Sequence, residues 1–393
     1  MKATFLILSL ALISLNCIQV HGASEVFSQI RGSTADSQMG YFPTQVLFYK
    51  SQFFAVMSID QLGTVGASPQ IRRYLPNTQS AGTLEASLDL PLPCNSSGCT
   101  AIVLFICLNQ NLLSGFAISG TGSEFSGSLF FAVDLDSFSI TAQRSPNAME
   151  QDLLGMWGYF PGPDLNCFAS FTNSTAGLGS YLASLALSTN FTSSPSSKIT
   201  PFTNIMFGAM SMTSGNVLIS GDSLIGGAVM MLSSSLKPIS APIHLAGFQL
   251  PSNVWPPAAA LQNSDLALLS WIDGSQTALS LIPLSAPLQR LSIQKMPFDG
   301  QRLVFGDATN IILVINNMDA GKIELLNYQI ISTNPTHLEL LGSTSLPQVL
   351  LILDSFAQSH SEQYDALSQR YAIIAGTTRD WTIYVMQLVS KNL

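Results

Sequence analysis

The sequence predicts an all-β fold in which one antiparallel unit recurs along the chain. Apolar runs of about four to eight residues, rich in Val, Ile, Leu, Phe and Thr, are bounded by Gly, Pro, Asn and Ser clusters. Pairs of these runs, joined by a tight turn, return roughly every 45 to 60 residues. The clearest pairs lie at 267–282, 311–326 and 371–386. The best helical candidate, 361–370, could equally be a loop.

The repeat length favours a β-propeller. Seven hairpin regions follow one another at 45–59, 101–118, 153–171 with 181–187, 217–232, 267–284, 311–331 and 371–388. Dividing the roughly 370 residues that follow the apolar N-terminal segment among them gives about 53 residues each, near the length of a four-stranded propeller blade with generous loops. One unit shows all four strands, at 302–305, 311–315, 322–331 and 337–341. We therefore predict about seven four-stranded blades, with six to eight possible.

Two further segments fit a closed ring of blades. The stretch 127–140 resembles the turn between the third and fourth strands in quinoprotein-type and related β-propeller repeats, a resemblance of architecture that covers about one blade. The segment 25–30 can supply the outer strand of the last unit and so remove the free edges. Tandem β-sandwiches are the alternative, but no polar or Pro-rich linker divides the chain near its middle.

The N-terminus predicts entry into the secretory pathway. Residues 1–15 carry one positive charge followed by an apolar run too short to span a bilayer comfortably. We expect a signal peptide at 1–22 and a single propeller domain at 23–393. No later apolar stretch is long enough for a membrane span, so a secreted or luminal product is expected, extracellular or in the lumen of the secretory pathway.

The cysteines and sequons agree with that compartment. Outside the predicted signal peptide lie Cys94, Cys99, Cys107 and Cys167, an even number that predicts two disulfides. Of the three possible pairings we favour Cys94 with Cys99 and Cys107 with Cys167, although Cys107 could instead be a buried free thiol. Glycosylation is predicted at the three sequons, Asn95, Asn173 and Asn190.

Charge and motif content exclude several functions. Only 10% of residues are charged, the net charge is −8 and the one basic pair is Arg72 with Arg73. Nucleic acid is therefore not expected as a partner. No spacing of Cys and His indicates a metal site, no glycine motif opens a helix to hold a phosphate, and no cofactor is implied. Oligomeric state is left open by the sequence.

Three carboxylates are the strongest catalytic candidates. Asp134 and Asp136 lie two residues apart at a strand end, and Asp307 lies in a connection between strands. If they converged at the propeller channel they could serve a carbohydrate hydrolase or lyase. However, tight turns also select Asp, because its side chain hydrogen-bonds its own backbone. Turn formation is the favoured interpretation, so no catalytic residue is assigned.

Irregular loops are the favoured binding elements. Trp157, Trp255 and His360 lie in segments rich in Pro, Gly or polar residues, where they could contact a protein or glycan ligand. Trp271 and Trp381 lie within repeated hairpins and are expected to pack between blades. The sequence therefore favours a propeller that acts as a binding or interaction module. The alternatives are the carbohydrate-active enzyme and a structural matrix or coat protein.

Overall fold

A computed structural model of the protein describes residues 21–33, 40–63, 65–75, 82–94, 98–121, 124–146, 156–172, 180–193, 197–245, 258–273, 276–296, 301–317, 319–350 and 363–390. Within these ranges the protein is built of β-strands, with one short 3₁₀ helix, η2 (Leu187–Thr189), and no α-helix. None of the described residues forms a helix long and apolar enough to cross a membrane. In the described part of the helical candidate, residues 363–370, the chain forms a short strand and a turn instead.

Pairing groups the described strands into seven antiparallel meanders, numbered blades 1 to 7 in chain order. The first strands are β2 (Tyr41–Tyr49), β6 (Cys99–Asn109), β10 (Met156–Pro161), β15 (Phe202–Met210), β19 (Ala258–Ala260), β23 (Gln301–Gly306) and β27 (Tyr364–Asp365). The second strands are β3 (Gln52–Gly63), β7 (Leu112–Thr121), β11 (Asn166–Thr172), β16 (Val217–Ser223), β20 (Leu266–Asp273), β24 (Asn310–Asn317) and β28 (Arg370–Gly376).

The third and fourth strands complete each blade toward the outside of the ring. The third strands are β4 (Gln70–Leu75), β8 (Glu124–Asp134), β12 (Ser180–Ala186), β17 (Gly226–Leu232), β21 (Gln276–Pro283), β25 (Lys322–Thr333) and β29 (Asp380–Ser390). The fourth strands are β5 (Thr83–Asp89), β9 (Ser139–Arg144), the pair β13 (Thr192–Ser193) and β14 (Ser197–Ile199), β18 (Ile243–His244), β22 (Gln294–Met296), β26 (Thr336–Leu346) and β1 (His21–Ser33).

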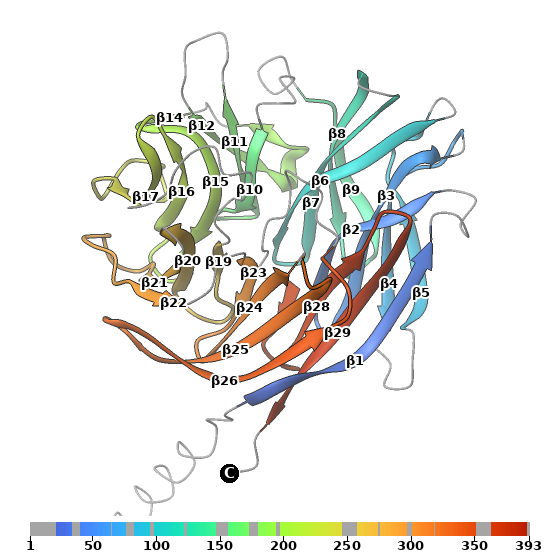
Figure 1. Ribbon diagram of the computed structural model, residues 1–393. Helices are drawn as coiled ribbons and strands as arrows, with labels where there is room; N and C mark the ends of the chain where they lie inside the picture. The colour runs from blue at the N-terminus through green and yellow to red at the C-terminus, as the bar shows by residue number, and fades with distance from the viewer. Residues whose placement is uncertain are drawn as a thin grey trace, which may run out of the picture.

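The N-terminal strand closes the ring. β1 pairs antiparallel with β29, for example Val26 with Met386 and Ile30 with Ile383, and so becomes the outer strand of blade 7. In Figure 1 the blades follow one another around a central axis in the order of the colour bar, and the blue strand β1 lies beside the red strand β29. The prediction that 25–30 supplies this strand is confirmed.

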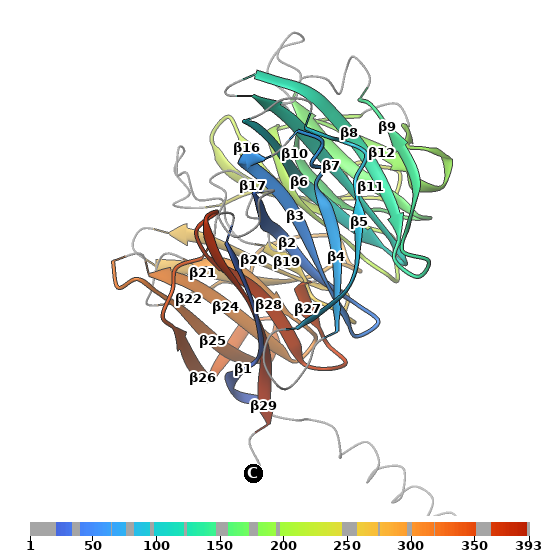
Figure 2. The same ribbon diagram turned by 90° about the vertical axis from the view of Figure 1, so that its right-hand side faces the viewer.

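Blades 1 and 2 share one continuous sheet. Strand β3 runs past its partners in blade 1 and pairs with β6 at Ile59 with Ala101 and at Gly63 with Cys99. The strands of both blades face the viewer in Figure 2. A disulfide joins Cys99 to Cys94 beside this junction. The first two blades are therefore linked by backbone pairing as well as by side-chain packing.

Seven clusters of buried apolar side chains form the core, one between each pair of neighbouring blades among the described residues. Alternate residues of a strand enter different clusters. In β2, Val46 and Phe48 pack toward blade 7, whereas Leu47 packs toward blade 2. A strand covered on both faces has no polar side, which explains the continuous apolar runs in the sequence. Tandem sandwiches would not give a cluster between the last blade and the first.

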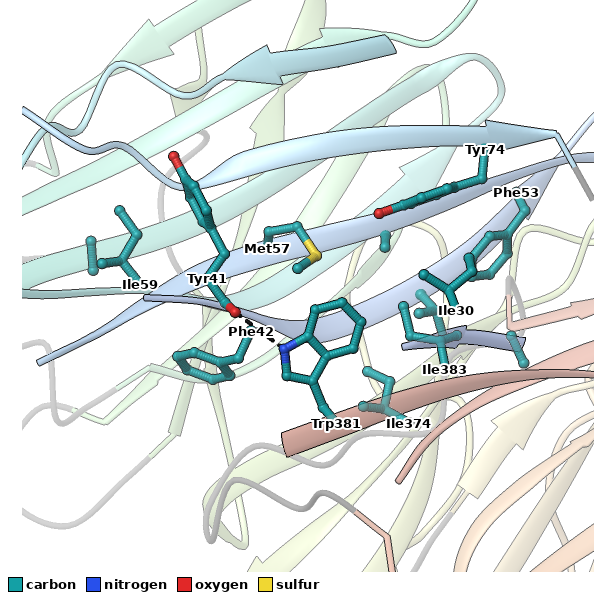
Figure 3. Close-up of a cluster of buried hydrophobic side chains, with 14 of the residues drawn as sticks. Ile30, Tyr41, Phe42, Phe53, Met57, Ile59, Tyr74, Ile374, Trp381 and Ile383 are labelled. Carbon is teal, nitrogen blue, oxygen red and sulfur yellow. Dashed lines mark hydrogen bonds between the residues drawn. The ribbon is translucent and has the colours of Figure 1, made fainter. Parts of the chain in front are cut away.

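Figure 3 shows the cluster that joins blade 7 to blade 1. Trp381 of β29 packs there among Phe42, Met57 and Ile374, and its indole Nε1 donates a hydrogen bond to the carbonyl of Tyr41 at 3.1 Å. The bond satisfies the single polar atom of a buried tryptophan, as burial requires. Trp271 packs in the same way between blades 4 and 5. Both tryptophans have the packing role predicted from their hairpins.

Candidate binding face

Successive meanders run in the same sense, so the turns between first and second strands all lie on one face of the ring. We call this the turn face; its turns are residues 50–51, 110–111, 162–165, 211–216, 261–265, 307–309 and 366–369. Neighbouring turns touch directly. Gln262 of blade 5 forms a parallel bridge with Asp307 of blade 6, and its amide donates to the carbonyl of Gly306 at 2.9 Å. The turns of blades 5 and 6 are therefore in direct contact.

Asp307 is the centre of one group of contacts on this face. Its Oδ1 accepts hydrogen bonds from the Thr309 amide (2.8 Å), the Thr309 hydroxyl (2.7 Å) and the Asn310 amide (2.9 Å). Its Oδ2 accepts from the Tyr364 hydroxyl (2.8 Å) and from Gln369 Nε2 (3.0 Å). Tyr364 and Gln369 belong to blade 7, so Asp307 connects blade 6 to blade 7. We call these five residues the Asp307 hub.

The hub makes Asp307 a structural anion. Burial opposes its ionisation, but the hydrogen bonds from Thr309, Gln369 and the backbone outweigh burial and lower its pKa below the usual range. A carboxylate offers about four acceptor positions, and five donors contact Asp307, so no acceptor position is left free. Burial and the nearby Asp307 charge raise the pKa of Tyr364, which stays protonated and can donate. The carboxylate is thus fully engaged and is not placed to act as a base.

The neighbouring turn of blade 7 is held equally firmly. The backbone amide of Ala366 donates to Gln262 Oε1 at 3.0 Å, so the turn of blade 7 contacts the turn of blade 5 directly. Asp365 accepts hydrogen bonds from the Leu367 amide at 3.1 Å and the Ser368 hydroxyl at 2.6 Å. These contacts fix the backbone on both sides of Leu367, whose side chain is nevertheless 84% exposed.

Asp265 makes a similar arrangement between blades 4 and 5. Its Oδ1 accepts from the Met212 amide at 2.8 Å, and its Oδ2 accepts from the hydroxyls of Ser211 (3.1 Å) and Thr213. Burial opposes ionisation of Asp265, but the bonds from Thr213 and Ser211 lower its pKa overall. Met212, in the middle of the turn, has its amide fixed and its side chain 82% exposed.

Together these turns form the candidate functional site. We call residues 211–216, 261–265, 307–309 and 366–369 the blade 4–7 arc. Within it, side-chain hydrogen bonds hold four successive turns, and two large apolar side chains, Leu367 and Met212, project into solvent. Exposed apolar side chains on an ordered backbone offer area that a macromolecular partner can bury at a low entropic cost.

Asp134 and Asp136 serve a turn. Asp134 Oδ1 accepts hydrogen bonds from the amides of Asp136 (2.8 Å) and Ser137 (3.2 Å) in the connection between β8 and β9. Asp136 forms an exposed ion pair with Lys50 of blade 1 at 2.8 Å. The structure does not bring these carboxylates together with Asp307, which lies in blade 6. Among the described residues, no three His, Cys, Asp or Glu side chains form a metal-binding group.

The cysteines form the two disulfides that we favoured from the sequence. Cys94 and Cys99 are disulfide-bonded with their Cα atoms 5.5 Å apart, and Cys107 and Cys167 with their Cα atoms 6.5 Å apart. The second bond joins β6 of blade 2 to β11 of blade 3. Beside it, Asn109 Nδ2 donates to the carbonyl of Gly162 at 2.8 Å and to that of Asn166 at 2.7 Å. On the turn face, blades 2 and 3 are therefore linked both covalently and by hydrogen bonds.

The predicted loop residues lie largely outside the described ranges. Trp255, His360 and the sequon residues Asn95 and Asn173 are among them, and Trp157 is described only as a backbone position of β10. Asn190 is described and is exposed. The arc residues Gln262, Asp265, Tyr364 and Gln369 were not foreseen as a group. Their common signal, polar residues in or beside the connections between first and second strands, is weak because such residues also form ordinary turns.

Structural comparison supports the propeller and nothing finer. The fold is similar to that of the Dos1 propeller, with a TM-score of 0.51 and 11% identity, over 94% of this chain and 96% of that one. A functionally unknown protein from Desulfotomaculum acetoxidans DSM 771 is similar at a TM-score of 0.51 and 11% identity, over 80% of this chain and 88% of that one. No family model matches the sequence, and neither does any curated protein. The chain has a β-propeller fold.

Proposed function

We propose that the protein is a secreted β-propeller that binds a protein partner through the blade 4–7 arc. The observation that carries this proposal is the pair Leu367 and Met212, which are 84% and 82% exposed on turns held by Asp365 and Asp265. Burying one large aliphatic side chain against a partner contributes about 1.5–3 kcal/mol. Because the turns are already ordered, little conformational entropy opposes the contact.

The carbohydrate-active enzyme is less well supported. A carbohydrate hydrolase or lyase of this kind needs two carboxylates that face each other across an open site. Asp307 is instead saturated by donors, and Asp136 is paired with Lys50 in a different blade. The described carboxylates therefore favour binding over catalysis.

Secretion is part of the proposal. Residues 1–22 have the character of a signal peptide, and two disulfides suit an oxidising compartment. Cleavage after Gly22 would leave the pairs of β1 with β29 from Ser24 onward intact. We further propose that the mature chain begins at Ala23 and carries N-linked glycans.

The binding proposal is tested by screening the mature protein on a peptide array and a glycan array, and comparing Leu367→Ser and Met212→Ser with the parent. We expect peptides with bulky apolar residues to bind the parent, and each substitution to weaken binding about tenfold or more. Both positions are highly exposed, so stability should change by less than about 0.5 kcal/mol.

The matched control uses the opposite face of the ring. Leu224 and Ile225 form the tip of the β16–β17 hairpin and are 77% and 75% exposed. The variants Leu224→Ser and Ile225→Ser remove similar apolar surface and should leave peptide binding unchanged. Binding that is lost in the control variants but kept in Leu367→Ser would place the site on the wrong face and refute the proposal.

A further inference from the structure

Asn190 lies in an ordered and exposed sequon. It follows η2 with a left-handed backbone (φ 53°), a conformation that Asn tolerates better than most residues. The next residue, Phe191, is buried and packs against Phe130 of blade 2 with ring centroids 5.7 Å apart. Thr192, the third sequon residue, is exposed at the start of β13. The buried phenylalanine thus fixes a turn that presents Asn190 to solvent.

The same turn covers the edge of the neighbouring blade. Asn190 Oδ1 accepts a hydrogen bond from the Gln143 amide of β9 at 3.1 Å. One residue further along that strand, Arg144 Nε donates to the carbonyl of Phe191 at 3.0 Å. β9 is the outer strand of blade 2, so without Asn190 its Gln143 amide would be open to pairing with another strand.

We propose that Asn190 carries an N-linked glycan on Nδ2 while Oδ1 keeps its hydrogen bond to Gln143, so that one amide both caps the edge of blade 2 and anchors a sugar there. This inference rests on the proposed secretion. The two arms of a carboxamide point in different directions, so engagement of the oxygen leaves the nitrogen directed elsewhere. Attachment at nitrogen also preserves the carbonyl as an acceptor.

The glycan is transferred from a single class of donor, an oligosaccharide joined through pyrophosphate to a polyisoprenoid lipid. Nδ2 forms a bond to the anomeric carbon of the sugar, and the bond from that carbon to the pyrophosphate oxygen breaks. The pyrophosphate leaves with the electron pair of the broken bond, and Nδ2 loses one proton. No oxidant or reductant takes part.

The position of Asn190 assigns the glycan to one sector of the ring. Turns between third and fourth strands lie on the same face as turns between first and second strands. The Leu187 amide of η2 donates to the carbonyl of Leu165, in the blade 3 part of the turn face, at 3.1 Å. The sugar therefore occupies the blade 2–3 sector and leaves the blade 4–7 arc open.

The experiment expresses the full chain in a eukaryotic secretory host and maps glycopeptides by mass spectrometry, with and without enzymatic deglycosylation. We expect the peptide containing Asn190 to carry glycan. Two variants separate the roles of the amide: Asn190→Asp removes the attachment nitrogen but keeps an acceptor oxygen, whereas Asn190→Gly removes both and suits the left-handed backbone. Hydrogen exchange at the Gln143 amide should stay slow in Asn190→Asp and become about two- to tenfold faster in Asn190→Gly.

An unmodified Asn190 in the secreted protein overturns the inference, as does equal Gln143 exchange in all three proteins. Glycan found on Asn95 or Asn173 in the same sample would show that the chain entered the pathway, so that secretion stands although the Asn190 inference fails. A chain that is retained in the cell without any glycan would refute both.

Discussion

The two halves of the ring are held together by different chemistry. Blades 1 to 3 contain both disulfides, Cys94–Cys99 and Cys107–Cys167. Among the described residues, ionised aspartates act at the turns of the other half: Asp265 joins blade 4 to blade 5, and Asp307 joins blade 6 to blade 7. A disulfide acts mainly by restricting the unfolded chain, whereas a hydrogen-bonded carboxylate acts only in the native state. The covalent half should therefore respond to reductant, and the aspartate half to acid.

The largest effect is expected from the link between blades 2 and 3. Replacing both Cys107 and Cys167 by Ser opens a bond that spans 60 residues, which should lower the free energy of unfolding by about 4 kcal/mol. The double variant Cys94→Ser with Cys99→Ser is the control, because its loop spans only 5 residues and its expected loss is about 2 kcal/mol. Urea unfolding measures both. Equal losses would contradict a role for loop length.

The Asp307 hub should come next. Asp307→Ala removes the acceptor of the Thr309 amide and hydroxyl, the Asn310 amide and one hydrogen of Gln369 Nε2, and should lower the free energy of unfolding by about 3 kcal/mol. Asp307→Asn keeps one acceptor oxygen and should cost less. If the alanine variant were as stable as the parent in urea, the hub would not hold blades 6 and 7 together.

Acid should weaken the aspartate half. The folded-state pKa of Asp307 lies below its ordinary value, so its contribution is fully present above the ordinary Asp pKa and is lost as the pH falls through the folded pKa. Asp265 behaves in the same way. We therefore expect Asp307→Asn to reduce the acid sensitivity of unfolding, measured by urea melts from neutral pH to about pH 3. Parallel pH profiles for parent and variant would contradict this assignment.

The smallest expected effect is a gain in stability, from a substitution at Asp222. Asp222 of β16 is 3% exposed, and its Oδ1 has no hydrogen-bond partner among the described residues. Burial raises its pKa, so ionisation is disfavoured in the folded state and stability is lost as the pH rises above the ordinary Asp value. Asp222→Asn removes the charge and should raise the thermal midpoint at neutral pH, with little change in acid. A destabilised variant at neutral pH would show that the charge is compensated.

The fold could be predicted because it depends on local patterns. The segment 311–331 is apolar on both faces of its two strands, so it must form a hairpin that is covered on both sides. A series of such hairpins along the chain can cover one another most simply by stacking into a ring. The blade 4–7 arc depends on contacts that no local pattern records. Gln262 meets Ala366 across 104 positions of sequence, and Asp307 meets Gln369 across 62. Helical spacing at 361–370 also concealed that this segment supplies the shortest first strand, β27.

Closure by β1 has a consequence for synthesis. The strand made first among those described must wait for β29, the last one, and Ser24 must wait for Thr344, 320 positions later, with which it exchanges two hydrogen bonds. Until then β1 has no partner strand, and Phe42 and Met57 of blade 1, against which Trp381 packs, stay uncovered. Such distant partners slow folding and leave strand edges uncovered during translation. Assembly of this ring should therefore depend on chaperones more strongly than its completed form suggests.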